Sequence, residues 1–170
     1  MIKLIYLIPL IMFSAQNVQA EVVPIDGAFG IKLGDTPKEK YRADELPTEI
    51  GKLFFVKPPI KNEHFNEYAV LVTHRTNKIF RIYAEKEQSL ATCKEELLKV
   101  KRSLENIYGT LTMKAQVFTL KQKNREINLT CKISKINNAE ASLQIKYVDH
   151  QIFKDSHKKA NPDRNDASGL

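Results

Sequence analysis

The chain has 170 residues, of which 42% are hydrophobic and 28% charged, and its formal net charge is +7 at pH 7. This length allows one domain with a tail, and the composition excludes both wholesale disorder and a collagen-like or linker-dominated chain. Two cysteines are too few for a cysteine-rich scaffold or a four-cysteine zinc site. The amino-acid sequence therefore predicts one ordinary globular domain.

Residues 1–20 predict a secretory signal peptide that is cleaved after Ala20. Lys3 supplies a positive charge, residues 4–13 are an apolar stretch, and Val18 and Ala20 are the small residues of the cleavage site Val18-Gln19-Ala20. An uncleaved membrane anchor is the alternative, but so short a helix extends only about 15 Å, roughly half of the hydrocarbon core. We therefore expect a periplasmic or secreted protein without a membrane span.

The predicted strands are β-rich runs bounded by turn residues. Prolines and glycines punctuate residues 21–59 and permit only short strands there. Two later runs are separated by residues 75–78, where Asn77 suits a positive φ, and these runs predict a β-hairpin. The predicted strands are 29–33, 53–56, 68–74, 79–84, 113–120, 126–134 and 141–147.

Residues 92–108 predict the main helix. Thr92 and Glu95 match the S/T-x-x-E capping box, and Gly109 stands where a left-handed cap ends a helix. Apolar residues recur every three or four positions as one stripe, at Cys93, Leu97, Val100, Leu104 and Ile107. The stripe predicts that this helix packs on the core.

Clean alternation of apolar and polar residues in the last two strands predicts an antiparallel sheet with one buried and one solvent-exposed face. We predict a single α+β domain over residues 21–154, with an antiparallel sheet of about five or six strands and one main amphipathic helix packed across a face. A short second helix is expected within residues 149–160. Residues 155–170 are expected to form a polar, mobile tail.

The two cysteines predict a structural disulfide. Cys93 lies on the apolar stripe of the helix, and Cys131 lies on the apolar row of a strand that this helix should cover. Two cysteines directed into one layer of an exported chain are good disulfide partners. The alternatives are a pair of buried free thiols and a redox-active pair, and the absence of C-x-x-C spacing disfavours the latter.

No motif for catalysis is present. The chain has no nucleophile elbow, zinc-protease motif, P-loop or EF-hand. His64 lies near Glu63 and Glu67, but such neighbours on a polar connection are more often solvated surface than metal ligands. Asp149 and His150 would suit a general base, yet no motif supplies a nucleophile. We predict a protein that is not an enzyme and that needs no metal or cofactor.

The positive charge is concentrated in residues 91–148, which carry 11 basic and 5 acidic side chains. Several of these lie on the solvent-exposed rows of the predicted strands, where they form a basic face with neighbouring amides. Such a face is a candidate protein-binding surface, the alternative being that it only promotes solubility. The predicted partner-binding residues are Lys114, Asn128, Lys132, Gln144 and Lys146.

The register of the predicted face depends on turn lengths. A three-residue turn at 137–139 would pair Lys132 with Gln144 and Lys146 with Thr130. We expect the two apolar rows of these strands to lie on the same side of the sheet.

The place of Lys114 depends on the loop after the strand at 113–120. A three-residue loop at 122–124 would bring Lys114 to the basic face together with Phe118 and Leu120. A two-residue loop would turn the strand over and bury Phe118 and Leu120, and we favour this burial because large apolar residues are usually interior.

We predict a small exported protein-binding protein, of immunity or inhibitor type, that neutralises a toxin or a cell-wall hydrolase. Its basic face would steer it to an acidic protein partner. The alternatives are an envelope-associated structural or accessory protein in weak contact with anionic envelope surfaces, and an unrecognised secreted hydrolase. Nucleic acid is not expected as a partner, because the chain is exported and no run of Lys and Arg exceeds two.

Overall fold

The computed structural model describes residues 23–38 and 42–160. The predicted signal peptide, with its cleavage after Ala20, lies outside the described residues, as does the segment 161–170 of the predicted tail. Within the described part of the chain, neither helix combines the length and the apolarity that crossing a bilayer requires.

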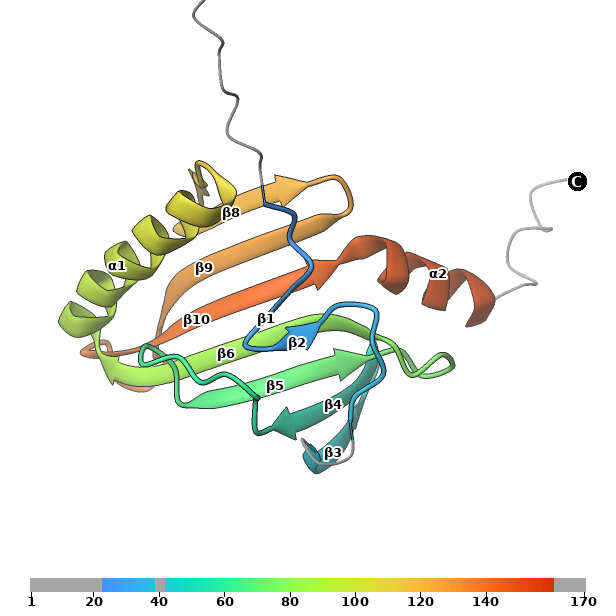
Figure 1. Cartoon of the computed structure of the whole chain (residues 1–170). Helices are drawn as coiled ribbons and strands as arrows, with labels where there is room; N and C mark the ends of the chain where they lie inside the picture. The colour runs from blue at the N-terminus through green and yellow to red at the C-terminus, as the bar shows by residue number, and fades with distance from the viewer. Residues whose placement is uncertain (1–22, 39–41, 161–170) are drawn as a thin grey trace, which may run out of the picture.

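The described residues form an α+β fold around one large antiparallel sheet (Figure 1). Eight strands lie in the order β3-β4-β5-β6-β10-β9-β8-β7, and β1 pairs with β2 in a separate small sheet. The α+β class and the antiparallel pairing agree with the prediction, but the sheet is wider than the five or six strands expected. The strands are β1 (Gly27–Ala28), β2 (Ile31–Lys32), β3 (Arg42–Thr48), β4 (Gly51–Val56), β5 (Glu67–Val72), β6 (Ile79–Ser89), β7 (Thr112–Lys114), β8 (Val117–Gln122), β9 (Arg125–Ile133) and β10 (Glu140–Asp149).

The two helices are α1 (Leu90–Tyr108) and α2 (His150–Ala160). The predicted main helix corresponds to α1 but begins earlier, because Ser89 is its N-cap and the Ser89 hydroxyl accepts a hydrogen bond from the backbone N–H of Thr92. The predicted capping box at Thr92 is therefore wrong. Gly109 ends α1 with a φ of 98°, a conformation that favours glycine. α2 is the predicted second helix, and it extends into the segment predicted as a tail.

The N-terminal edge of the sheet was not predicted, because it contains a proline. Pro47 of β3 pairs with Lys52 of β4. Proline cannot donate to a hydrogen-bond ladder, but an edge strand has one side without a neighbour and tolerates it. β3 is the outermost strand at this end of the sheet.

The core lies on one face of the sheet, beneath α1 and the β1–β2 hairpin (Figure 1). Cys93, Val100 and Leu104 of α1 are buried against the sheet. The ring of Phe29, between β1 and β2, contacts Tyr68 and Tyr147 with centroid distances of 5.1 and 6.2 Å. The helix and the hairpin thus cover the same face, and the opposite face of β7–β10 is left open.

The predicted disulfide between Cys93 and Cys131 is confirmed. It joins α1 to β9 across a Cα–Cα distance of 6.0 Å. Cys93 is completely buried, and Cys131 packs against the core from β9. A disulfide is typical of a protein that reaches an oxidising compartment, so the bond fits an extracellular location.

The β9–β10 hairpin has the predicted faces but a different register. Lys132 pairs with Ser142, Thr130 with Gln144 and Asn128 with Lys146. The predicted pairs of Lys132 with Gln144 and of Lys146 with Thr130 are therefore wrong by two residues. Because side chains alternate with a period of two, this shift leaves every side chain on its predicted face.

The predicted strand 113–120 is in fact a second hairpin. The chain turns back at Ala115 and Gln116, whose φ values are 49° and 66°, and β7 pairs with β8. The next loop contains two residues, because Gln122 pairs with Arg125, and Leu120 is buried as we favoured. Neither predicted alternative included the turn at Ala115.

The β7–β8 turn provides a test of this hairpin. Both central residues adopt a positive φ, as in a type I′ turn, although neither is the Asn or Gly that this turn prefers. We expect the double substitution Ala115→Asn and Gln116→Gly to raise the free energy of unfolding by about 1 kcal/mol, because it relieves left-handed strain. Urea unfolding would measure the change, and Gln116→Ala, which keeps the strain, should have no such effect. Lower stability of the double variant would contradict the assigned turn.

Candidate functional site

The candidate site is the open face, defined here as the side of β6–β10 that is turned away from α1. The register places every predicted partner-binding residue on this face, one on β7, two on β9 and two on β10. These residues are Lys114, Asn128, Lys132, Gln144 and Lys146. The sequence pattern therefore places the five residues on one face. Lys114 lies there for a reason that was not predicted, which is the β7–β8 turn.

Lys114 reaches the open face through the β7–β8 turn. It pairs with Val117 of β8, next to the position where Thr119 pairs with Asn128 of β9. The turn also leans over the sheet, because the hydroxyl of Thr130 donates a hydrogen bond of 3.0 Å to the carbonyl oxygen of Gln116. Lys114 is consequently held at one wall of a groove instead of lying in a continuous strand.

The groove has a volume of about 410 Å³ and extends across four neighbouring strands, β7 to β10. Its two flanks carry lysines, and polar side chains form its floor. The lining residues are Lys114, Ala115, Val117, Thr119, Asn128, Thr130, Gln144 and Lys146. Three strand spacings make the groove roughly 14 Å wide, which is enough for one extended polypeptide segment.

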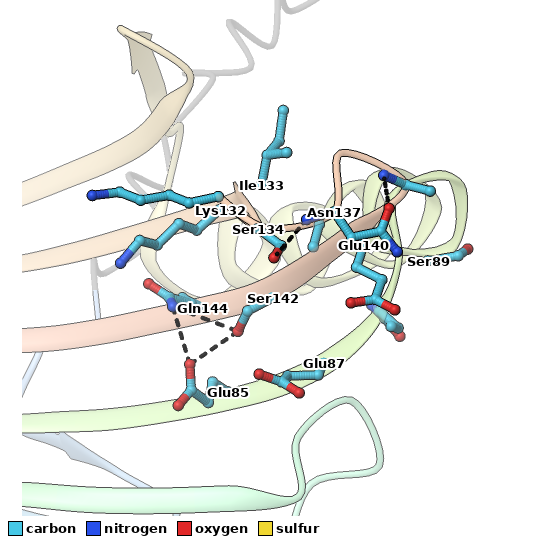
Figure 2. A pocket seen from close by; sticks show the side chains of 14 residues that line it. Glu85, Glu87, Ser89, Lys132, Ile133, Ser134, Asn137, Glu140, Ser142 and Gln144 are labelled. Carbon is cyan, nitrogen blue, oxygen red and sulfur yellow. Dashed lines mark hydrogen bonds between the residues drawn. The ribbon is translucent and has the colours of Figure 1, made fainter.

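A second hollow, of about 830 Å³, adjoins the groove beneath the β9–β10 loop (Figure 2). Gln144 lines both hollows, which therefore adjoin on the open face and are together called the depression. Lys132 lies at the rim of the second hollow, together with Glu87 and Glu140. The depression therefore has both basic and acidic walls at this end.

Glu85 of β6 is the centre of a hydrogen-bond network on the open face. Its Oε2 accepts hydrogen bonds from Ser142 Oγ at 2.9 Å and from Gln144 Nε2 at 3.0 Å. Figure 2 shows both side chains directed from β10 towards Glu85. The hydroxyl of Tyr83 donates to the same oxygen. The amide of Gln144 is thus committed to the protein itself and positions the floor of the depression.

Asn128 is committed in a similar way. Its Nδ2 donates to Glu126, and its Oδ1 accepts a hydrogen bond of 2.9 Å from Thr119. Burial works against ionisation of Glu126, but the hydrogen bonds from Asn128 and Lys121 outweigh it and lower the pKa of this carboxyl. Of the five predicted residues, the two amides therefore shape the face, and the lysines are left to meet a partner.

The open face is divided by charge and is not uniformly basic. Lys121 is neutralised by Glu126, with Nζ and Oε2 at 3.3 Å. Among the described residues, Lys114, Lys132 and Lys146 have no carboxylate within 4 Å. Towards β5, acidic residues become more frequent, because Glu67 pairs directly with Glu85. These three lysines lie on β7, β9 and β10.

The contribution of β6 was missed from the sequence. Arg81, Tyr83 and Glu85 alternate along the strand and all face the open side. The predicted strand ended at residue 84, and the balanced charge of residues 21–90 gave no reason to look there. The alternation itself was the signal that could have identified these side chains.

Asp149 and His150 do not form a catalytic pair. Asp149 Oδ1 accepts hydrogen bonds of 3.0 Å from the backbone N–H groups of Gln151 and Ile152, and its Oδ2 lies 3.0 Å from Arg125 Nε. The ring of His150 instead lies 3.3 Å from Glu126. Asp149 is therefore the N-cap of α2, and its carboxylate is fully used by the protein.

The described residues contain no cluster of three or more side chains suited to hold a metal ion. Comparison with protein-family models, with curated proteins and with solved structures finds no match to this chain.

Proposed function

We propose that this chain is a small exported protein-binding protein, of immunity or inhibitor type, that neutralises a toxin or a cell-wall hydrolase. The observation that carries the proposal is the open face, where Lys114, Lys132 and Lys146 line a depression and, among the described residues, have no carboxylate within 4 Å. An uncovered sheet face with unpaired cations favours a partner of opposite charge.

The charge of the side chains that line the depression indicates the charge of the partner surface. Three lysines favour an acidic surface, since complementary charge steers the encounter and fixes the orientation of the complex. The fixed amides of Asn128 and Gln144 supply a floor that needs little reordering on binding. The disulfide between α1 and β9 supports a rigid scaffold behind this face.

Affinity capture from the cell envelope of the source organism tests the proposal. We expect the mature chain to retain one stoichiometric protein and to inhibit that protein's toxic or hydrolytic activity. The double substitution Lys114→Glu and Lys146→Glu should weaken the complex about tenfold or more, because it places like charges opposite each other. The matched control, Lys94→Glu with Lys99→Glu, makes the same charge change on exposed positions of α1 and should bind as the wild type does.

The alternative functions predict different results. Salt-sensitive binding to envelope fragments without a protein partner would overturn the proposal in favour of a structural or accessory role. Turnover of a substrate by the purified chain, lost on replacing His150 or His64 with the fold intact, would overturn it in favour of a hydrolase. A captured protein that binds the face variant and the wild type equally would show that the open face is not the binding surface.

A further inference from the structure

Two cations meet on the open face at the border of β6 and β10. Arg81 pairs with Val148, and Tyr83 pairs with Lys146, so that Arg81 and Lys146 are diagonal neighbours on this face. Residues in this relation lie about 7 to 8 Å apart, which is within reach of two long side chains. The two charged groups can therefore contact the same ligand.

Within the described part of the chain, the Arg81 guanidinium makes no hydrogen bond. Its Nε is buried, and among the described residues no oxygen accepts a hydrogen bond from it. The guanidinium carbon lies 5.8 Å from the centre of the Phe80 ring, which supports one side of the group. Burial lowers the pKa of Arg81. The planar guanidinium group of Arg81, which has five N–H donors, is thus held in place without a hydrogen bond to the described residues.

Lys146 is held beside Arg81 by an aromatic ring. Its Nζ lies 5.8 Å from the centre of the Tyr83 ring, and the Tyr83 hydroxyl is fixed by its hydrogen bond to Glu85. Burial lowers the pKa of Lys146, and the charges of Arg81 and Lys132 lower it further, while Glu85 acts in the opposite direction. The ammonium group of Lys146 is therefore held in position, but its positive charge is only partly balanced.

Glu85, whose charge acts on Lys146, does not neutralise this pair. Oε2 of Glu85 already accepts from Tyr83, Ser142 and Gln144, and neither cation lies within 4 Å of a carboxylate among the described residues. Arg81, Lys146 and Lys132, which acts on Lys146, carry three positive charges, and Glu85 with its cross-strand neighbour Glu67 carries two negative charges, so the net charge of this group is +1. One monovalent anion would neutralise this net positive charge.

We propose that Arg81 and Lys146 form an anion-binding pair that receives one carboxylate side chain of the acidic partner. This inference rests on the proposed function and deepens it. A carboxylate matches the planar donor edge of the guanidinium, with the ammonium of Lys146 donating a further hydrogen bond. A divalent phosphate fits less well, because Glu85 and its neighbour Glu67 repel the second negative charge.

Titration with a glutamate hexapeptide at low salt, followed by NMR, tests the pair. We expect the peptide to shift the side-chain signals of Arg81 and Lys146 and to raise the pKa of Lys146. Arg81→Met and Lys146→Met should each weaken peptide binding about tenfold, as expected for loss of one charge-assisted contact. Lys94→Met removes one exposed charge on α1 and should leave the affinity within about twofold of the wild type.

The outcomes separate this inference from the proposed function. Peptide binding that is unchanged in Arg81→Met and Lys146→Met, or binding of inorganic phosphate without binding of the peptide, would overturn the anion-binding pair. Capture of the protein partner by Arg81→Met with wild-type affinity would also overturn it, while leaving the proposed function intact. Spectra of each variant under native conditions verify the fold. Arg81→Lys keeps the positive charge but lacks the planar pair of N–H donors, so it should bind the peptide more tightly than Arg81→Met and less tightly than the wild type.

Discussion

Replacing Cys93 and Cys131 together with alanine is expected to lower the free energy of unfolding by about 4 kcal/mol. The bond closes a chain segment of 38 residues, and cross-linking a segment of this length restricts the unfolded chain considerably. Cys93 is completely buried beneath α1, so the substitution also removes contacts from the core. Urea unfolding monitored by circular dichroism would measure the loss as a lower midpoint.

Controls distinguish the cross-link from the packing. The wild type with its disulfide reduced should lose nearly as much stability as the double alanine variant, because both lack the covalent link. A loss below about 1 kcal/mol in both would contradict a structural role for the bond. Two free thiols in the native protein, detected by mass spectrometry, would contradict the bond itself.

The disulfide lies on the covered side of the sheet, so its loss should not remove the open face. Cys131 points towards α1, whereas its neighbours Thr130 and Lys132 point to the opposite side. Below the temperature at which it unfolds, the double alanine variant should therefore bind the partner as the wild type does. Stability and recognition are carried by opposite faces of the same strand.

The faces of β9 and β10 could be predicted because their alternation is regular, but their register could not. The register depends on the loop between them, where Ser134 Oγ accepts hydrogen bonds of 3.3 Å from the backbone N–H groups of Ile136 and Asn137. Such local hydrogen bonds lengthen the loop beyond the three residues assumed. The grouping of the lysines and amides was unaffected, since the error was an even number of residues.

The β7–β8 hairpin could not be predicted, because its turn lacks the usual residues. Ala115 and Gln116 are not the Asn and Gly that indicate a type I′ turn, and their positive φ has no signature in the sequence. The pairing of β7 with β8 and the hydrogen bond from Thr130 maintain the strained turn. Lys114 therefore reached the predicted face through a hairpin that neither alternative contained.

β6 illustrates a different difficulty, which is that its second half looks solvated. Glu85, Lys86 and Glu87 are consecutive charged residues, a pattern typical of a loop or an exposed helix face. In the structure they continue β6, because Ser142, Leu143 and Gln144 of β10 pair with them. Pairing with a strand distant in sequence overrides the local preference, and a single sequence does not reveal it.

Replacing Asp149 with alanine is expected to lower the free energy of unfolding by about 3 kcal/mol. The substitution removes the N-cap of α2, which contributes about 1 kcal/mol, and leaves the Arg125 guanidinium without its carboxylate. The Arg125 side chain is 31% exposed, so water replaces part of the lost ion pair and the cost stays below that of a fully buried pair.

Asp149→Asn separates the two contributions, because it keeps an oxygen for the cap and loses the charge. We expect it to cost about half as much as Asp149→Ala, and hydrogen exchange at Gln151 and Ile152 should accelerate only in the alanine variant. Arg125 also donates a hydrogen bond of 2.7 Å to the carbonyl oxygen of Ile25, so both variants should loosen the N-terminal segment. Equal losses in the two variants would contradict the capping role and leave the ion pair as the sole function of this carboxylate.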